Sequence, residues 1–303
     1  MVEALYGCDC SYTRARYFCE NLESQGYRPW LPRAVSEGIC NSVTSSQLSK
    51  TPLPPGFKVL IYGNSHLRQV LEALMCIVSQ RVAHKRVTYE VGPERVMKTV
   101  RGGASCRHST RADWETLDDH HCLLEADQSE GEGKDCSDDT GEFYMTNDAV
   151  VHYYFSGGDE NKSIGDALSY HNNASWSDYD AVFANSGNPP VMLKESVLTS
   201  AFELQDASVP FFWLSAYDGQ GDIRRWEESD ISRFHESGAR YVDISSMTRG
   251  LRSLTKGAVE EGSKSQSYSS KFGDPHFCLP GPPDEMGLLL LKLMWAVYEE
   301  NVG

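Results

Sequence analysis

The architecture of this protein follows from residues 57–80, which read Phe57-Lys-Val-Leu-Ile-Tyr-Gly-Asn-Ser-His-Leu-Arg-Gln-Val-Leu-Glu-Ala-Leu-Met-Cys-Ile-Val-Ser-Gln80. Phe57–Tyr62 is a short apolar run, which predicts a buried strand. His66–Gln80 carries its apolar residues at helical spacing, which predicts a helix. Only Gly63-Asn64-Ser65 separates the two, so we expect the strand to turn directly into the helix.

The same alternation continues along the chain. Further strands are expected at Arg86–Val91, Ala149–Phe155, Ala181–Ala184, Val209–Leu214 and Arg240–Ile244, and further helices at Val191–Gln205, Ile231–Ser237 and Asp284–Asn301. Strands that alternate with helices imply a mostly parallel sheet covered on both faces. We therefore expect one α/β domain over residues 56–303, a three-layer sandwich with a central sheet flanked by helices.

Two segments depart from this pattern. Residues 1–55 are rich in cysteine, proline and aromatic residues, and we expect an irregular lead-in that packs on the main domain. Residues 113–142 hold twelve acidic residues and one basic residue, Lys134, and are expected to form a solvated insertion or disordered loop.

The composition excludes two classes of protein. The net charge of −15 argues against binding to a nucleic acid duplex, which requires clustered Lys and Arg. No segment of the sequence approaches the roughly 20 apolar residues of a membrane-spanning helix.

The nine cysteines favour an oxidising compartment, because they exceed what a reduced domain usually carries and are not spaced as a zinc ribbon. The sequons Asn161-Lys-Ser163 and Asn173-Ala-Ser175 agree with this. We expect the secretory pathway, either the Golgi lumen or the extracellular space, although residues 1–20 contain no apolar signal segment.

The first candidate site is Gly63-Asn64-Ser65, at the carboxyl end of an expected parallel strand. Open α/β sheets bind their ligands at this edge. Ser65 there presents a hydroxyl, and its own N–H at the helix start favours a developing anion. The alternative is that Asn64 or Ser65 only caps the helix.

The second candidate is Gly273-Asp-Pro-His-Phe-Cys-Leu-Pro-Gly281, directly before the last helix. A serine hydroxyl becomes a good nucleophile when an imidazole takes its proton and a carboxylate orients that imidazole. His276 and Asp274 are candidates for these roles. The alternative is a structural loop with an exposed histidine.

The third candidate is Asn185-Ser-Gly-Asn188, which also follows a strand. Gly187 allows close backbone approach, and the side chain of Asn185 can donate to an oxyanion. An ordinary turn is the alternative, since Asn and Gly are typical turn residues.

Together these motifs make the chain resemble the SGNH (GDSL-like) hydrolase superfamily, and within it the PC-esterase group that includes the plant trichome-birefringence-like polysaccharide O-acetyltransferases. Ser65 is followed by Arg68 and Cys76 at the family's spacing, and Asn185-Ser-Gly187 is similar to its Asn-x-Gly. His276-Phe-Cys-Leu-Pro-Gly-Pro-Pro-Asp284 is similar to its closing His-Trp-Cys-Leu-Pro-Gly-x-x-Asp.

The chain departs from the family pattern at three positions. Asn64 stands where the serine block has Asp, a position that supports the turn. Gly273 stands where the family places its acid, three residues before the histidine, while Asp274 is two before. Another acid could therefore orient His276, or a Ser-His dyad could operate. Phe277 replaces the Trp and has no indole donor.

The resemblance implies an SGNH/flavodoxin-like fold and serine-dependent acyl transfer on O-acylated carbohydrate, by a polysaccharide O-acetyltransferase or an acetylesterase. Ser65, His276 and Asp274 would be catalytic, and the residues around an oxyanion or substrate would be Gly187, Asn185, Asn188 and Arg68. The implied partners are an acetylated polysaccharide or sugar acceptor and an acetyl donor, with no cofactor or metal, and we expect a monomer.

Two alternatives remain open. One is a non-catalytic module on the same scaffold that binds carbohydrate or a protein partner, with its triad decayed at Gly273 and Asn64. The other is a lipid or phosphodiester hydrolase of the same superfamily.

Three other features have a structural interpretation. His120-His121 beside Asp118-Asp119 could bind a metal, but a solvated acidic loop is favoured. Trp213 and Tyr217 could form the floor of a sugar site, but aromatic residues of the core or rim are favoured. Arg68 could be an exposed helical arginine as readily as a contact to an acyl donor.

Overall fold

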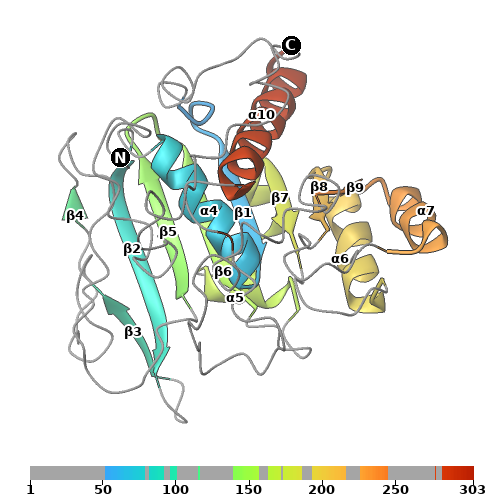
Figure 1. The fold of residues 1–303 in the computed structure, drawn as a ribbon, viewed down its shortest axis with the longest axis horizontal. Coiled ribbons are helices and arrows are strands. Elements are labelled where there is room, and N and C mark those ends of the chain that lie inside the picture. Colours follow the sequence, from blue (N-terminus) through green and yellow to red (C-terminus); the bar gives the residue numbers. More distant parts are fainter. Residues whose placement is uncertain are drawn as a thin grey trace, which may run out of the picture.

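A computed structural model describes residues 52–78, 82–91, 96–100, 115–116, 139–156, 163–171, 173–185, 193–215, 226–244, 277 and 282–303. Within these residues the chain has an α/β fold with helices packed on a mixed sheet (Figure 1). Nearly all of the expected lead-in, residues 1–51, lies outside the described residues.

Within the described residues the sheet has nine strands, eight of them in the order β3-β2-β5-β6-β1-β7-β8-β9, with β4 paired to β2. Their bounds are β1 Lys58–Gly63, β2 Val82–Val91, β3 Val96–Val100, β4 Glu115–Thr116, β5 Asp139–Met145, β6 Val150–Phe155, β7 Ala181–Ala184, β8 Phe211–Leu214 and β9 Arg240–Val242. From β6 to β9 every neighbouring pair is parallel, whereas β5, β2, β3 and β4 pair antiparallel. The six neighbouring strands β5-β6-β1-β7-β8-β9 are therefore mostly parallel.

Numbered by their sequence order, the parallel strands β6-β1-β7-β8-β9 have the order 2-1-3-4-5. The order therefore reverses between β1 and β7, which pair in register from Val59↔Ala181 to Tyr62↔Ala184. In open sheets such a reversal opens a crevice at the carboxyl ends of the two strands, where ligands bind. Ser65 follows β1 and Asn185 follows β7.

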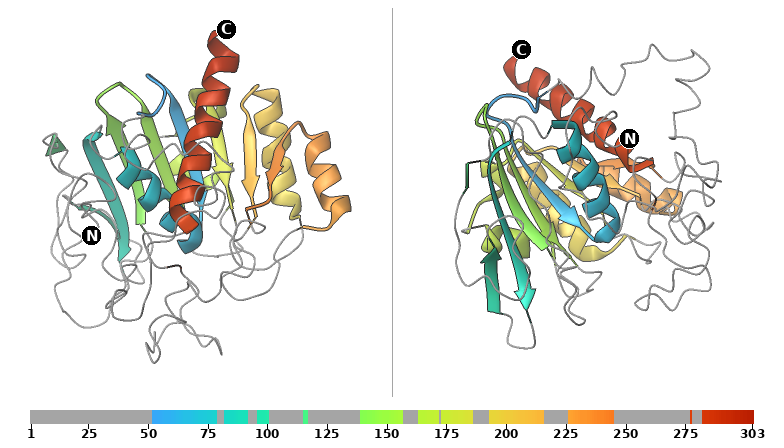
Figure 2. Two further views of the ribbon diagram at one scale, coloured as in Figure 1. Left: turned by 45° about the horizontal axis from the view of Figure 1, so that its top comes forward. Right: turned by 60° about the vertical axis from the view of Figure 1, so that its left-hand side comes forward.

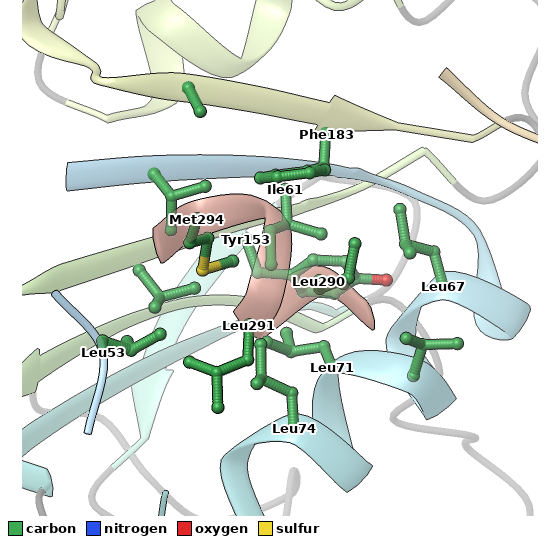
Figure 3. Close-up of a cluster of buried hydrophobic side chains, with 14 of the residues drawn as sticks. Leu53, Ile61, Leu67, Leu71, Leu74, Tyr153, Phe183, Leu290, Leu291 and Met294 are labelled. Carbon is green, nitrogen blue, oxygen red and sulfur yellow. The ribbon is translucent and has the colours of Figure 1, made fainter. Parts of the chain in front are cut away.

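Helices cover both faces of the sheet (Figure 2). The helices of the described residues are α4 Ser65–Val78, α5 Asp166–Tyr170, α6 Glu195–Asp206, α7 Glu228–Glu236 and α10 Pro282–Val302, with a short 3₁₀ turn, η3, at Trp176–Asp178. On one face α4 and α10 pack on alternate residues of β1 and β6, among them Ile61 and Tyr153 (Figure 3). On the other face α6 and α7 pack on Leu60, Val182 and Trp213.

The expected strands and helices are confirmed, with small shifts of their ends. The strand expected at Arg86–Val91 is part of β2, which is antiparallel to its neighbours. One expectation was wrong in part. The acidic stretch is not a loop throughout, because β4 lies within it and its last four residues begin β5. Glu142 there is 4% exposed and faces away from the α4 side.

None of the helices in the described part of the chain combines the length and the apolar composition that a membrane crossing requires.

Helices α4 and α10 pack closely against each other at Gly287. A Cβ atom built at this glycine would lie 3.0 Å from the backbone nitrogen and 3.1 Å from the Cα of Leu74. Both contacts are to backbone atoms, so a larger residue would push the two helices apart. The buried surface between them includes Leu71, Leu290 and Met294.

We predict that Gly287→Val lowers the free energy of unfolding by about 1–3 kcal/mol, the usual cost of overpacking a filled core. Urea denaturation measures the change. Lys292→Val, at an exposed position of the same helix, introduces the same branched side chain and is the control. Equal stability of the two variants would contradict the close packing of α4 on α10.

Candidate functional site

The turn from β1 to α4 is built by Gly63 and Asn64. A Cβ atom at Gly63 would lie 2.8 Å from the Cβ of Leu67 and 3.2 Å from the carbonyl oxygen of Asn185, so no side chain fits. The Oδ1 atom of Asn64 accepts a hydrogen bond from the backbone N–H of His66 at 3.0 Å. Asn64 therefore caps α4, which confirms the capping interpretation for this residue and its place in supporting the turn. The structure describes Ser65 as the first residue of the helix.

Both neighbouring strands hold this turn in place. The backbone N–H of Ser156, after β6, donates to the carbonyl of Gly63 at 2.8 Å, and that of Asn185, after β7, donates to the carbonyl of Tyr62 at 2.9 Å. The hydroxyl of Tyr153 donates to the carbonyl of Asn64 at 3.2 Å. The position of Ser65 is thus fixed from both sides at the carboxyl edge of the parallel strands.

Asn185 is buried and its amide nitrogen is already engaged. Nδ2 donates to the carbonyl oxygens of Leu214 and Ser215, at 3.1 and 3.2 Å. Two carbonyl acceptors fix the orientation of the amide, since only its NH₂ end can face them. Oδ1 is buried and accepts no hydrogen bond from the described residues. For Asn185 to donate to an oxyanion, one of these two bonds would have to be exchanged.

Gln69 connects α4 to the segment that precedes α10. Its Nε2 atom donates to the carbonyl oxygen of Phe277 at 2.7 Å, and its Oε1 atom accepts from the backbone N–H of Phe277 at 3.3 Å. All of this is buried, and the ring of Phe277 lies in the core beneath α4 and α10. Gln69 lies one helical turn after Ser65 on α4. Phe277 is therefore held beside this turn of the helix, although it is far from Ser65 in the sequence.

The predicted site residues divide into two groups. Ser65, Arg68 and Asn185 are described, and two of them lie at the facing ends of β1 and β7. Arg68 is 2% exposed, so the interpretation as an exposed helical arginine was wrong. The residues His276, Asp274, Gly187 and Asn188 lie outside the described residues, as do His120, His121 and Tyr217.

Trp213 belongs to the core, as the favoured interpretation predicted. It is 4% exposed and stacks on Trp226 with ring centroids 5.0 Å apart. Of the nine cysteines, Cys76 alone falls within the described residues.

A second polar cluster, which sequence reasoning missed, lies on the other face of the sheet from α4. It consists of Glu142 on β5, its cross-strand partner His152 on β6, and His171 directly after α5. All three are buried, and one ligand atom from each lies within 4.8 Å of the others. The available signal was His152, a polar residue within the apolar strand Val150–Phe155, but nothing in the sequence pairs it with Glu142 or His171.

Comparison with family models and with curated proteins identifies no family for this chain. No family model matches the chain, and no curated protein matches it.

The first turn of α10, which follows the closing motif, carries Asp284 and Glu285. Burial and, to a lesser extent, the neighbouring carboxylate of Asp284 raise the pKa of Glu285 to about 7. The folded protein therefore holds this proton more tightly than the unfolded chain does.

We predict that Glu285 makes the free energy of unfolding fall as the pH rises from about 4.5 to about 7. Glu285→Gln should remove this dependence and stabilise the protein above pH 7 by about 1 kcal/mol. This gain is smaller than the free energy equivalent to the whole pKa shift, because solvent still reaches the side chain. Urea denaturation at several pH values measures this. The exposed Glu299→Gln on the same helix is the control, and a matching gain there would contradict the assignment.

We predict that Gln69→Leu, which is similar in size, costs about 2–4 kcal/mol of stability because it removes both hydrogen bonds between the Gln69 side chain and the buried backbone of Phe277. The amide proton of Phe277 should also exchange faster with solvent. Urea denaturation and hydrogen exchange measure the two effects. Gln205→Leu, at an exposed position of α6, is the control. Unchanged protection of the Phe277 amide would show that Gln69 does not hold this segment.

Proposed function

We propose that the chain is an SGNH-type acyl-transfer enzyme with an SGNH/flavodoxin-like fold, resembling the PC-esterase group. The strand order 2-1-3-4-5 supports this, because it is the flavodoxin-like order and opens its crevice between β1 and β7. The serine motif follows one of these strands and the Asn-x-Gly motif follows the other. Both motifs therefore start at the place where such a sheet binds ligands.

The observation that carries the proposal is the pair of hydrogen bonds from Gln69 to the backbone of Phe277. Residues four apart lie on the same face of a helix, so Gln69 holds Phe277 along the face on which Ser65 begins α4. His276 is the residue next to Phe277. This contact supports the proposal that His276 lies near Ser65, although the two are more than two hundred positions apart, as a nucleophile and its base require.

In the proposed reaction His276 takes the proton of the Ser65 hydroxyl while the Ser65 oxygen attacks the acyl carbonyl. The backbone N–H of Ser65, at the start of α4, and that of Gly187 would stabilise the oxyanion. Asn185 would join them by exchanging one of its carbonyl partners. The protonated His276 then gives its proton to the departing alkoxide, and an acyl-serine remains.

The acyl-serine would next be attacked by water, giving an esterase, or by a sugar hydroxyl, giving a transferase. In both cases His276 takes the proton of the attacking hydroxyl and returns it to Ser65 as the acyl group leaves. Asp274 is proposed to orient His276. Arg68 and Asn188 are proposed to contact the substrate, and for Arg68 this contact would come from a buried guanidinium.

The proposed substrates are an acetylated polysaccharide or sugar acceptor and an acetyl donor, and the proposed compartment is the Golgi lumen or the extracellular space. The cysteine content and the two sequons support that compartment. A monomer is proposed.

We predict that a fluorophosphonate ester labels the protein at Ser65, and that Ser65→Ala abolishes both the label and nearly all release of acetate from acetylated glycans. Mass spectrometry of the labelled peptide and an acetate assay, with and without a sugar acceptor, measure the two effects. Ser229→Ala, at an exposed position of α7, should keep both and is the control.

The other outcomes separate the competing functions. No label on the wild-type protein, together with binding of glycans, would favour the non-catalytic module. A label at Ser65 with activity on phospholipid and none on acetylated xylan or pectin would favour a lipid hydrolase. Acetate release that persists in Ser65→Ala would contradict the assigned nucleophile.

A further inference from the structure

We propose that Glu142, His152 and His171 form a binding site for a divalent transition-metal ion such as Zn²⁺, separate from the Ser65 region. These three residues are 4, 6 and 3% exposed. Two imidazoles and one carboxylate are a ligand set that suits zinc and its neighbours in the first transition row better than calcium or magnesium. The proposal does not depend on the proposed acyl-transfer function.

The closest pair in the cluster already has the spacing of two ligands on one ion. The Nδ1 atom of His171 lies 3.2 Å from the Oε1 atom of Glu142. Two ligands on a tetrahedral zinc ion with bonds of about 2.0–2.1 Å lie about 3.3 Å apart. A metal ion can therefore take the place of the proton between these atoms with little movement of either side chain.

The third ligand comes from His152. Its ring stacks on that of His171 with centroids 4.2 Å apart and planes 18° apart, so the ring of His152 must rotate out of this stack for both lone pairs to point at one ion. The Nδ1 atom of His152 is 2.9 Å from the hydroxyl of Tyr179. If Nδ1–H donates to the oxygen of Tyr179, Nε2 carries the lone pair that a metal requires.

The cluster also has the outer partners that orient metal ligands. The hydroxyl of Tyr179 fixes His152, and the hydroxyl of Tyr144 donates to the Oε2 atom of Glu142 at 3.2 Å. Such second contacts fix the orientation and tautomer of the ligands. The ring of Tyr179 in turn makes a cation–π contact with Lys58, whose Nζ atom lies 4.9 Å from the centre of the ring.

The position of the cluster indicates a structural ion. Glu142 and His152 are cross-strand partners, and His152 pairs with Leu60 of β1, three residues before Gly63 at the end of that strand. Their side chains lie on the face away from α4. An ion here would join β5, β6 and the end of α5, so it would fasten the antiparallel part of the sheet to the parallel part.

The test is a titration of the full-length, chelator-treated protein with Co²⁺, followed by displacement with Zn²⁺. We expect one equivalent to bind, with the visible absorption of cobalt on nitrogen and oxygen ligands. At a Zn²⁺ concentration about 100 times the dissociation constant, the melting temperature should rise by about 5 °C. Failure of the wild-type protein to bind one equivalent would overturn the proposal.

Variants locate the ion. Glu142→Gln and His152→Gln should each weaken binding by at least about 100-fold, since even outer partners are worth about 10–100-fold. Tyr179→Phe, which keeps the ring, should weaken metal binding by about 10-fold. This variant replaces the ligand variants in the test if they fail to fold. Circular dichroism checks folding. The exposed His235→Gln should bind as the wild type does.

Two further outcomes would overturn the assignment. Loss of the ion in a His120→Ala, His121→Ala double variant, with binding intact in the cluster variants, would place it at His120 and His121. A sulfur-to-cobalt charge-transfer band would place it on cysteines.

Discussion

The two hydrogen bonds between the side chain of Gln69 and the backbone of Phe277 are the contact on which the candidate site depends. They join residues 208 positions apart inside the core. Because the amide group of Gln69 bonds to both the N–H and the carbonyl of Phe277, the backbone of Phe277 has a fixed position on α4. The close approach of Gly287 to Leu74 fixes the same two parts of the chain from the α10 side.

The sheet separates two polar regions with different physical character. At the carboxyl edge, the turn at Gly63 and Asn64 is supported by backbone hydrogen bonds from the ends of β6 and β7, which suits a site that must hold a nucleophile at the molecular edge. On the other face, His171 pairs with Glu142 and stacks on His152, and His152 contacts the hydroxyl of Tyr179. Buried polar groups of this kind persist only with partners, and an ion is one such partner.

Local pattern predicted the parts of the fold whose residues interact with near neighbours in the sequence. The helix of residues 65–78 and the strand Ala181–Ala184 were predicted almost to the residue, because apolar spacing reports which side faces the core. Strand β5 was missed because it begins with Asp139 and Gly141, which are poor strand formers. In the site, Ser65 and Asn185 were placed correctly at strand ends, while the role of Gln69 and the burial of Arg68 were not foreseen.

The sequence by itself determined the alternation of strands and helices, and with it an α/β fold that has serine and asparagine at the ends of two strands. Only the tertiary structure decided that β1 and β7 lie side by side, that Gln69 meets Phe277, and that Glu142 meets His152 and His171. The physical reason is that periodicity records the environment of each side chain, buried or exposed. Which distant residue supplies that environment depends on strand order and register, and these are set by the packing of the whole chain.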